Sequence, residues 1–391
     1  MHTSILGNMN APIKSKDLTG AEVSWFAPIC NGDDEFLGAH DPQYRSSWAN
    51  ASRIAKTADR LGYRNMLCPS SYQVGQDTLP FVAGLAPQLE QMNLLAAVRC
   101  GEVHPPMLAR TLATIDHMAK GKLTVNIISS DLPGEQLPSE DRYQRSREVI
   151  QILKQAWTQE EISIQGQFYN FTLPSDPGKP YQQNGGPLLY FGGYSPPGLA
   201  LCAEHCDVYL LWPNTEAVLQ EQITSMATLA TEHGRVIDYG LRVHVIVRET
   251  EAEAIEASRR LMSHINPEAG TEIRNRAQDA KSLGVAKQSE LREGANADGF
   301  AEDQLWTGIG QARSGCGAAI VGDPDQVLAK IRRYQAMGFR SFIFSGYPHL
   351  AECELFARYV LPQLETVSLP QVYGRIPQGE PLSPLGVGPR K

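Results

Sequence analysis

Two polar side chains on one predicted β-strand are the first candidates for chemistry in this chain. In YGLRVHVIVRET (239–250), valines alternate with Arg242, His244 and Ile246, which is the period-two pattern of a strand. Arg242 and His244 are two residues apart, so both side chains leave the same face of the strand. Because an unpaired guanidinium is costly to bury, that face is predicted to border a wet cavity or an anionic ligand. The alternative is structural, with the arginine in a salt bridge and the histidine in a hydrogen bond.

Polar residues suited to binding also follow other predicted strands. The turn at 192–195 (GGYS) leads into a helix and resembles a phosphate-binding site, because glycines let the backbone approach and the helix N-terminus offers N–H groups. Asn126 and Ser129 could hydrogen-bond the polar edge of a ring. Three arginines could hold a small anion through bidentate contacts: Arg99, Arg242 and Arg313. The sequence has neither an HExxH motif nor a nearby Ser-His-Asp order, so hydrolysis by zinc or by a triad has no support.

The elements that must position these residues are short apolar strands that alternate with longer helices along residues 21–365. This alternation predicts βαβ units and a parallel sheet, and runs such as LLAAV (94–98) suit strands covered on both faces. The count of eight or nine strands favours a closed (β/α)8 TIM barrel over an open doubly wound sheet. No GxxxxGK loop is present and no GxGxxG follows the first strand, which weakens a Rossmann interpretation. The candidate residues are therefore predicted to meet where the strands of a barrel end.

Three segments do not follow this alternation of strands and helices. Residues 1–20 are expected to form a flexible leader, either disordered or draped over the protein. The polar segment 266–317, which ends in QARSGCG, is predicted to be a lid inserted into the barrel, because loops this long inside a compact domain are usually functional. Residues 366–391 are rich in proline and lack periodicity, so they are predicted to form an extended C-terminal arm, either disordered or lying on a neighbouring subunit.

Composition narrows the classes of function. The formal net charge of −8 over 391 residues argues against a nucleic-acid partner, because there is no basic surplus to neutralise phosphates. No apolar run approaches the ~20 residues of a membrane span, and the N-terminus lacks the apolar core of a signal peptide. The seven cysteines include no CxxC pair, which argues against structural zinc and predicts reduced thiols in a cytoplasmic protein. No metal site is expected.

Four motifs carry a resemblance to a known family: YGLRVHVIVRET (239–250), PLLYFGGYS (187–195), LWTGIGQARSGCGAAIVGDP (305–324) and SGYPHLAE (345–352). Over about residues 23–364 the chain resembles the two-component flavin-dependent alkanesulfonate monooxygenases of the bacterial-luciferase-like superfamily, and the last two motifs are specific to the sulfonate branch. The resemblance implies a TIM barrel that takes FMNH2 from a separate NAD(P)H-dependent flavin reductase. With O2 as cosubstrate, such an enzyme cleaves a C–S bond of a small organosulfonate and yields an aldehyde and sulfite. A homodimer or homotetramer is expected.

The resemblance also implies roles for individual residues. Arg242 and His244 match the family's active-site Arg-x-His pair, and Arg313 matches the arginine of its mobile loop. Tyr347 and His349 match the SGYPH motif. Trp212 matches the active-site tryptophan. The sulfonate is expected to contact Arg99, Arg242, Arg313 and Trp212. The positions that hold FMN in the superfamily correspond here to Asn126, Ser129, Tyr143, Gly193, Tyr194 and Ser195.

The chain departs from the alkanesulfonate pattern at two internal places and in its C-terminal tail. The loop after the second strand reads PSSYQVGQD (69–77), without the cysteine of the family's TGRSCED-like loop, and Ser139 stands where the family has a histidine. These departures predict a substrate more polar than a linear alkanesulfonate, and the sulfosugar sulfoquinovose is preferred. The alternatives are a linear alkanesulfonate monooxygenase, a flavin- or deazaflavin-dependent oxidoreductase on the same fold, and a non-catalytic flavin-binding barrel.

Overall fold

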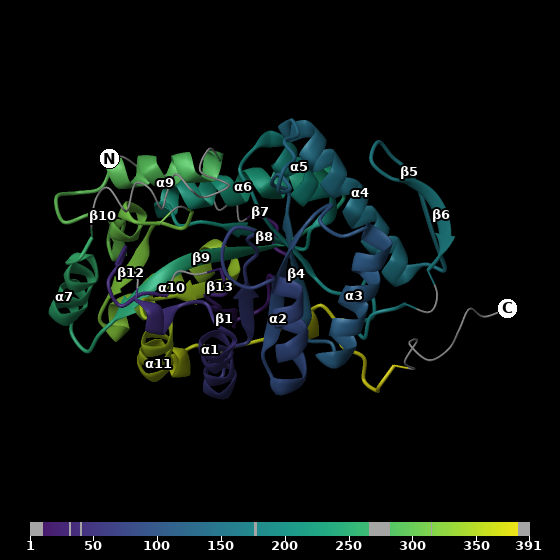
Figure 1. Ribbon diagram of the computed structural model, residues 1–391. Helices are drawn as coiled ribbons and strands as arrows, with labels where there is room; N and C mark the ends of the chain where they lie inside the picture. The colour runs from purple at the N-terminus through teal and green to yellow at the C-terminus, as the bar shows by residue number, and fades with distance from the viewer. Residues whose placement is uncertain are drawn as a thin grey trace.

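Eight parallel strands close into a barrel in the computed structural model, which describes residues 11–30, 33–39, 41–175, 178–265, 282–313 and 315–381. Neighbours around the barrel follow the order β1-β2-β3-β4-β7-β8-β9-β13, and β13 pairs back with β1. The strands are β1 (Glu22–Phe26), β2 (Asn65–Cys68), β3 (Asn93–Arg99), β4 (Leu123–Ile128), β7 (Leu189–Gly192), β8 (Val208–Leu211), β9 (Asp238–Val247) and β13 (Phe339–Ser345). Helices surround them (Figure 1). The predicted (β/α)8 TIM barrel is confirmed.

Helices follow the strands along the chain and begin and end at residues suited to those positions. They are α1 (Trp48–Leu61), α2 (Thr78–Leu85), α3 (Pro105–Met118), α4 (Ser139–Thr158), α5 (Pro196–His205), α6 (Glu216–Glu232), α7 (Glu251–Met262), α9 (Leu283–Glu293), α10 (Pro324–Met337), α11 (His349–Tyr359) and α12 (Leu369–Val372). In α10, for example, the Asp323 carboxylate accepts the N–H of Gln326, and the Gln326 side chain accepts the N–H of Asp323. This capping box supplies partners for N–H groups that the helix itself leaves unpaired.

Strand β9 carries the first candidate residues, and its pairing fixes where they lie. Residues 238–241 pair with β8, whereas residues 244–247 pair with β12 (Ala319–Gly322). Along the other edge, β13 places Ile343 beside Arg242 and Ser345 beside His244. Of the nine predicted strands, the one outside the closed barrel is therefore β12. The antiparallel strands β11 (Leu305–Trp306) and β10 (Phe300–Glu302) extend the sheet beyond it. All of β9 is buried, so both candidate side chains are inside the protein.

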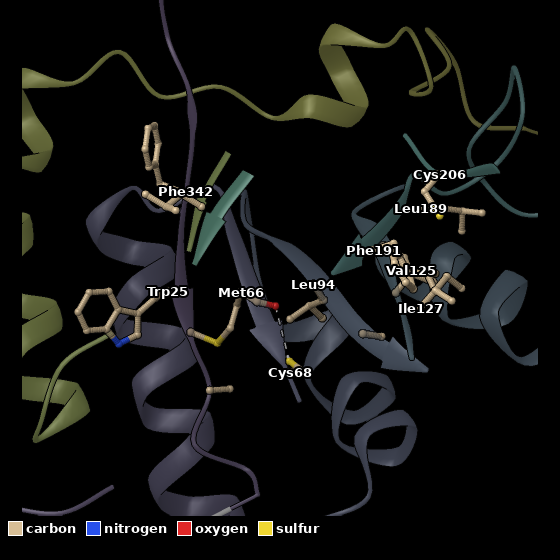
Figure 2. Close-up of a cluster of buried hydrophobic side chains, with 14 of the residues drawn as sticks. Trp25, Met66, Cys68, Leu94, Val125, Ile127, Leu189, Phe191, Cys206 and Phe342 are labelled. Atoms are coloured by element: carbon tan, nitrogen blue, oxygen red, sulfur yellow. Dashed lines mark hydrogen bonds between the residues drawn. The ribbon is translucent and has the colours of Figure 1, made fainter. Parts of the chain in front are cut away.

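The main hydrophobic core gathers residues from successive barrel strands and from the helices. Figure 2 shows Trp25 of β1, Met66 of β2 and Leu94 of β3 in this cluster. The Trp25 ring meets that of Tyr63 edge-on at 5.5 Å, and Phe356 of α11 packs beside it at 6.5 Å. Since side chains alternate along a strand, the residues between these apolar ones can carry polar groups on the opposite face.

The N-terminal end of the barrel is closed by both ends of the described chain. The Glu22 carboxylate accepts hydrogen bonds from the Tyr190 hydroxyl at 2.6 Å and from the N–H of Leu369 in α12 at 3.3 Å. Ser15 bonds to Asp238 through its N–H and its hydroxyl. Residues 11–20 and 366–375 thus pack on the barrel. For residues 11–20 this is the draped form of the expected leader, whereas residues 366–375 lie on the barrel of their own chain and not as the disordered or partner-bound arm that was expected. The reason is that buried polar groups at this end need partners, and Leu369 is fully buried. Residues 1–10 and 382–391 of the expected leader and arm lie outside the described residues.

The insertion expected to form a lid is folded where the structure describes it. It contains α9, β10, β11 and the 3-10 helix η3 (Gly308–Gln311). The buried Lys330 of α10 bonds to Glu216 at 2.7 Å and to Glu302 at 2.5 Å, and so ties β10 to the barrel helices. Residues 266–281 and Ser314 lie outside the described residues, and movement of the segment on ligand binding stays a prediction.

A two-stranded hairpin between α4 and β7 was not expected from the sequence. Strands β5 (Glu161–Gln165) and β6 (Asn170–Pro174) pair antiparallel beside α4 (Figure 1). Ile162 and Ile164 are buried while their neighbours are exposed, so one face of β5 packs on the protein. The hairpin lengthens the connection between β4 and β7 without altering the barrel.

Candidate functional site

Arg242 is a buried cation without a carboxylate partner among the described residues. Its guanidinium lies above the ring of Phe26, with Cζ 4.6 Å from the ring centroid. The residue is 8% exposed, and its Nη1 has no hydrogen-bond partner in the described part of the chain. Two nearby arginines differ, because Arg248 pairs with Glu352 and Arg313 pairs with Asp34. The described structure thus gives Arg242 no salt bridge, and its environment fits an anionic ligand.

His244 is held by protein groups at both ring nitrogens. Nε2 lies 3.2 Å from the carbonyl oxygen of Cys316, and Nδ1 lies 2.6 Å from the Ser345 hydroxyl. A carbonyl oxygen only accepts, so Nε2 carries the proton and Nδ1 accepts from Ser345. Burial, reinforced by the nearby charge of Arg242, lowers the pKa of His244 well below its usual value. His244 is therefore a neutral imidazole with a fixed tautomer.

Arg313 reaches the same region from the end of the insertion. Its Nη2 lies 2.5 Å from Asp34 Oδ2, and its guanidinium lies over the Tyr347 ring at 5.2 Å. The Tyr347 ring is 5.3 Å from those of both His244 and His349. Burial raises the pKa of Tyr347, so this phenol keeps its proton at neutral pH. The Nε of Arg313 is buried and has no partner among the described residues.

His349 begins α11 directly beside this cluster. Its backbone N–H donates to Asp33 Oδ1 at 2.8 Å, and its ring stacks on Phe26 at 5.7 Å. Burial raises the pKa of Asp33 to about 6. Phe26 thus lies against both Arg242 and His349, and the loop after β1 supplies carboxylates to two site elements.

The residues of the predicted phosphate site lie at the start of α5. Ser195 is the N-cap residue of this helix, and its Oγ is buried without a hydrogen-bond partner among the described residues. The Tyr143 hydroxyl lies over the first turn, because a Cβ on Gly198 would be only 2.9 Å from it. The carbonyl of Gly193 accepts from the Tyr209 hydroxyl at 2.8 Å. A hydroxyl, a phenol and a helix N-terminus here converge on one place, as phosphate binding requires.

Two further predicted flavin residues end strand β4. Asn126 lies between Ala97 of β3 and Tyr190 of β7 in the barrel register. Its Oδ1 and the Oγ of Ser129 are buried and have no partner within the described ranges. Buried polar atoms are nearly always hydrogen-bonded, so the lack of a protein partner for these two atoms fits the binding of a polar ligand.

Trp212 and Tyr194 form a third group at the end of β8. The backbone N–H of Trp212 donates to the Tyr194 hydroxyl at 2.7 Å, and the centroids of the two rings are 6.3 Å apart. A Cβ on Gly315 would lie 3.3 Å from the Trp212 ring. Trp212 therefore contacts the loop that also carries Arg313.

Arg99, predicted to contact the substrate, forms its hydrogen bonds with the turn after β4. Its Nη1 donates to the Ser130 hydroxyl and, at 3.4 Å, to the Asp131 carbonyl. Arg99 thus fixes the turn after β4, and no described contact joins it to Arg242 or Arg313. Its use as a sulfonate ligand stays a prediction.

The described contacts bring five predicted residues into one cluster: Arg242, His244, Arg313, Tyr347 and His349. Three members of the site were not predicted: Phe26, Asp34 and Cys316. Ser345 was expected at this rim only as the first residue of the SGYPH motif. Phe26 ends strand β1 and Asp34 follows it, so their position after a barrel strand was the one available signal. Their partners depend on contacts between distant segments that no local pattern reveals.

Three of the six predicted flavin residues, Asn126, Ser129 and Ser195, have buried polar atoms without a partner among the described residues, and such atoms suit a polar ligand such as FMN. Ser195 with Tyr143 would hold the phosphate, and Asn126 with Ser129 would bond the ring system. No group of three or more His, Cys, Asp or Glu side chains is placed to hold a metal within the described ranges. Over the same residues, no helix is both long and apolar enough to cross a bilayer.

Comparisons with known proteins identify relatives of the whole chain. Residues 21–341 match the model of the luciferase-like monooxygenase family. A sulfoquinovose monooxygenase from Agrobacterium fabrum is 56% identical over 97% of this chain and 99% of its own length. A second, from Novosphingobium aromaticivorans, is 48% identical over 88% of this chain and 96% of its length.

Solved structures with low sequence identity share the fold. A riboflavin lyase superposes with a TM-score of 0.71 at 16% identity, covering 94% of each chain. A long-chain alkane monooxygenase gives a TM-score of 0.70 at 15% identity, covering 93% of each chain. The family match and the two close relatives agree with this architecture, and the chain belongs to the luciferase-like monooxygenases.

Proposed function

We propose that the protein is a two-component, FMNH2-dependent monooxygenase that desulfonates an organosulfonate with O2, with sulfoquinovose as preferred substrate. The buried guanidinium of Arg242, which has no carboxylate partner among the described residues, is the observation that carries this proposal. A sulfonate is an anion whose oxygens accept the hydrogen bonds that such a group can donate. The names of the two relatives at 56% and 48% identity supply the substrate class.

The sulfonate is proposed to lie between two guanidinium groups. Arg242 offers Nη1, and Arg313 offers Nε while Asp34 holds its Nη2. Tyr347, whose ring lies under Arg313, keeps its proton and donates a further hydrogen bond from its hydroxyl. Two cations and a phenol together would stabilise the negative charge that stays on sulfur as sulfite leaves.

FMN is proposed to bind along the rim from β4 to α5, through Asn126, Ser129, Tyr143, Gly193, Tyr194 and Ser195. A separate NAD(P)H-dependent flavin reductase would deliver it reduced, since a two-component enzyme does not reduce its own flavin. When bound, reduced FMN supplies two electrons to O2, so that one oxygen atom enters the substrate carbon and the other leaves as water. Trp212 and the loop at 315–317 would exclude water from this region.

The proposed division of labour among the histidines follows from their contacts. His244 uses both ring nitrogens on Cys316 and Ser345, so it orients the site and keeps a neutral charge. Tyr347 and His349 remain as groups that can hold or move a proton beside the anion.

The preference for a polar substrate rests on the loop after β2. Ser70 and Ser71 are half-buried there, whereas Tyr72 is 70% exposed. The N–H of Gln76 donates to the Ile29 carbonyl, and the Thr78 hydroxyl donates to the Pro69 carbonyl, so the loop is anchored at the rim. Hydroxyl groups in such a place favour a substrate that can pair with them.

A linear alkanesulfonate remains the second candidate, because the same two arginines would serve it. Cytoplasmic location is proposed from seven cysteines that are all free thiols in the structure. A homodimer or homotetramer stays a prediction.

The test is a coupled assay with the purified protein, a flavin reductase, NADH and FMN, offered sulfoquinovose and octanesulfonate in parallel. We expect sulfite release from sulfoquinovose that requires the reductase, with a kcat/KM above that for octanesulfonate. Absence of sulfite from both compounds would overturn the proposed function, and a higher kcat/KM for octanesulfonate would overturn the substrate preference.

A further inference from the structure

The helix α9 of the insertion lies directly on the rim of the barrel. A Cβ on Gly284, in its first turn, would approach the Trp212 ring to 2.8 Å and the Tyr194 ring to 3.1 Å. Arg292, near its C-terminal end, donates to the carbonyl of Gly310 at 2.9 Å. The helix therefore touches the end of β8 and the η3 segment that precedes Arg313.

Gln288, in the middle of α9, bridges these two parts of the rim. Its Nε2 donates to the Pro213 carbonyl at 2.8 Å, and its Oε1 accepts the Gly317 N–H at 3.0 Å. The side chain is 7% exposed, so both bonds are shielded from water. A carboxamide has a donor and an acceptor on one rigid plane, which suits it to join a carbonyl and an N–H on separate segments.

The segment that Gln288 holds is also attached to the candidate anion site. Cys316, next to Gly317, accepts from His244 through its carbonyl and donates its thiol proton to the Arg242 carbonyl at 3.2 Å. Gly317 in turn accepts the Gly310 N–H at 2.9 Å. Residues 316 and 317 are thus held on one side by β9 and on the other by Gln288.

We propose that Gln288 is a positioning residue that sets the loop carrying Arg313 over the substrate anion. The inference rests on the proposed function, because it assigns Arg313 to the sulfonate. Removing the amide would leave the Gly317 N–H without its partner and release the outer side of the loop. Arg313 would then approach the sulfonate in the wrong place, while the flavin residues of β4 and α5 keep their positions.

The test compares Gln288→Met with Glu290→Met, which introduces the same side chain at an exposed position of the same helix. We expect Gln288→Met to raise the KM for sulfoquinovose by about tenfold with a smaller change in kcat, since a misplacement of ~1 Å can cost up to about a hundredfold. Affinity for reduced FMN should stay close to wild type, while the thermal midpoint should fall by a few degrees because the Gly317 N–H and the Pro213 carbonyl lose their partner. Glu290→Met should match wild type in all four measurements.

A second pair of variants separates positioning from general stability. In an Arg313→Ala background, adding Gln288→Met should change the KM by less than about twofold, because residues acting through one contact are not additive. A full tenfold effect in that background, or an unchanged KM in Gln288→Met alone, would overturn the inference. Absence of sulfite release by the wild-type protein would instead remove the proposed function.

Discussion

Replacing Arg242 with methionine should stabilise the ligand-free protein while removing its activity. Arg242 is 8% exposed and lacks a carboxylate partner among the described residues, so folding removes from water a charge that few contacts within the protein offset. Methionine keeps the length and the apolar stem of the side chain and removes the charge. Stability and activity should therefore move in opposite directions.

The magnitude follows from the contacts of the guanidinium. The effective desolvation penalty of a buried ion is several kcal/mol, and the cation–π contact with Phe26 at 4.6 Å returns about 1–2 kcal/mol. The variant should thus gain about 1–3 kcal/mol in the free energy of unfolding. Loss of a charged partner for the sulfonate should cost about 3–5 kcal/mol, or roughly 10²- to 4 × 10³-fold in kcat/KM.

The assay is urea unfolding of the ligand-free protein together with sulfite release, with Arg248→Met as the matched control. Arg248 pairs with the buried Glu352 at 2.6 Å, so its loss strands a carboxylate and should destabilise by about 3 kcal/mol. The reasoning is refuted if Arg242→Met is destabilised as much as the control, or if it releases sulfite at the wild-type rate.

Three further changes follow from the same contacts. Ser195→Ala should weaken reduced-FMN binding by about 1.5–3 kcal/mol in an anaerobic titration without loss of stability, because its Oγ bonds to none of the described residues; unchanged affinity would contradict this. Ser345→Ala should destabilise by about 1–3 kcal/mol in urea, because Nδ1 of His244 loses its donor, and a change near zero would disprove the assigned tautomer. Burial raises the pKa of Asp33 to about 6, above its value in the unfolded chain. The folded state therefore binds the proton more tightly, and the stability gained from this is lost as pH rises from about 4 through 6. Relative to Asp33→Asn, the wild type should gain up to about 3 kcal/mol as pH falls through that window, and a constant difference would argue against the shift.

The barrel could be predicted because the evidence for it lies in short-range patterns of the sequence. Alternation of apolar strands with amphipathic helices follows from how each segment buries its own residues, and the Arg242–His244 pair follows from the period of one strand. The role of β12 could not be predicted in this way. The apolar sequence of β12 is like that of a barrel strand. It pairs with β9 only because β9 is long enough to continue beyond the end of β8.

The site was predictable as a set of residues and less so as a set of contacts. His244 was expected in the active site, and its two nitrogens bond to Cys316 and Ser345, which lie 72 and 101 positions away in the sequence. Arg99 and Arg242 are both buried arginines in barrel strands, and only the structure shows that one has partners. Such differences depend on contacts between segments far apart in the sequence, and these contacts produce no periodic pattern in the sequence.

The most direct test of the account is the ratio of sulfite formed to O2 consumed when a flavin reductase supplies reduced FMN and sulfoquinovose is saturating. A monooxygenase whose arginines hold the sulfonate beside the flavin should form close to one sulfite for each O2. O2 consumption that yields hydrogen peroxide and no sulfite would contradict the account.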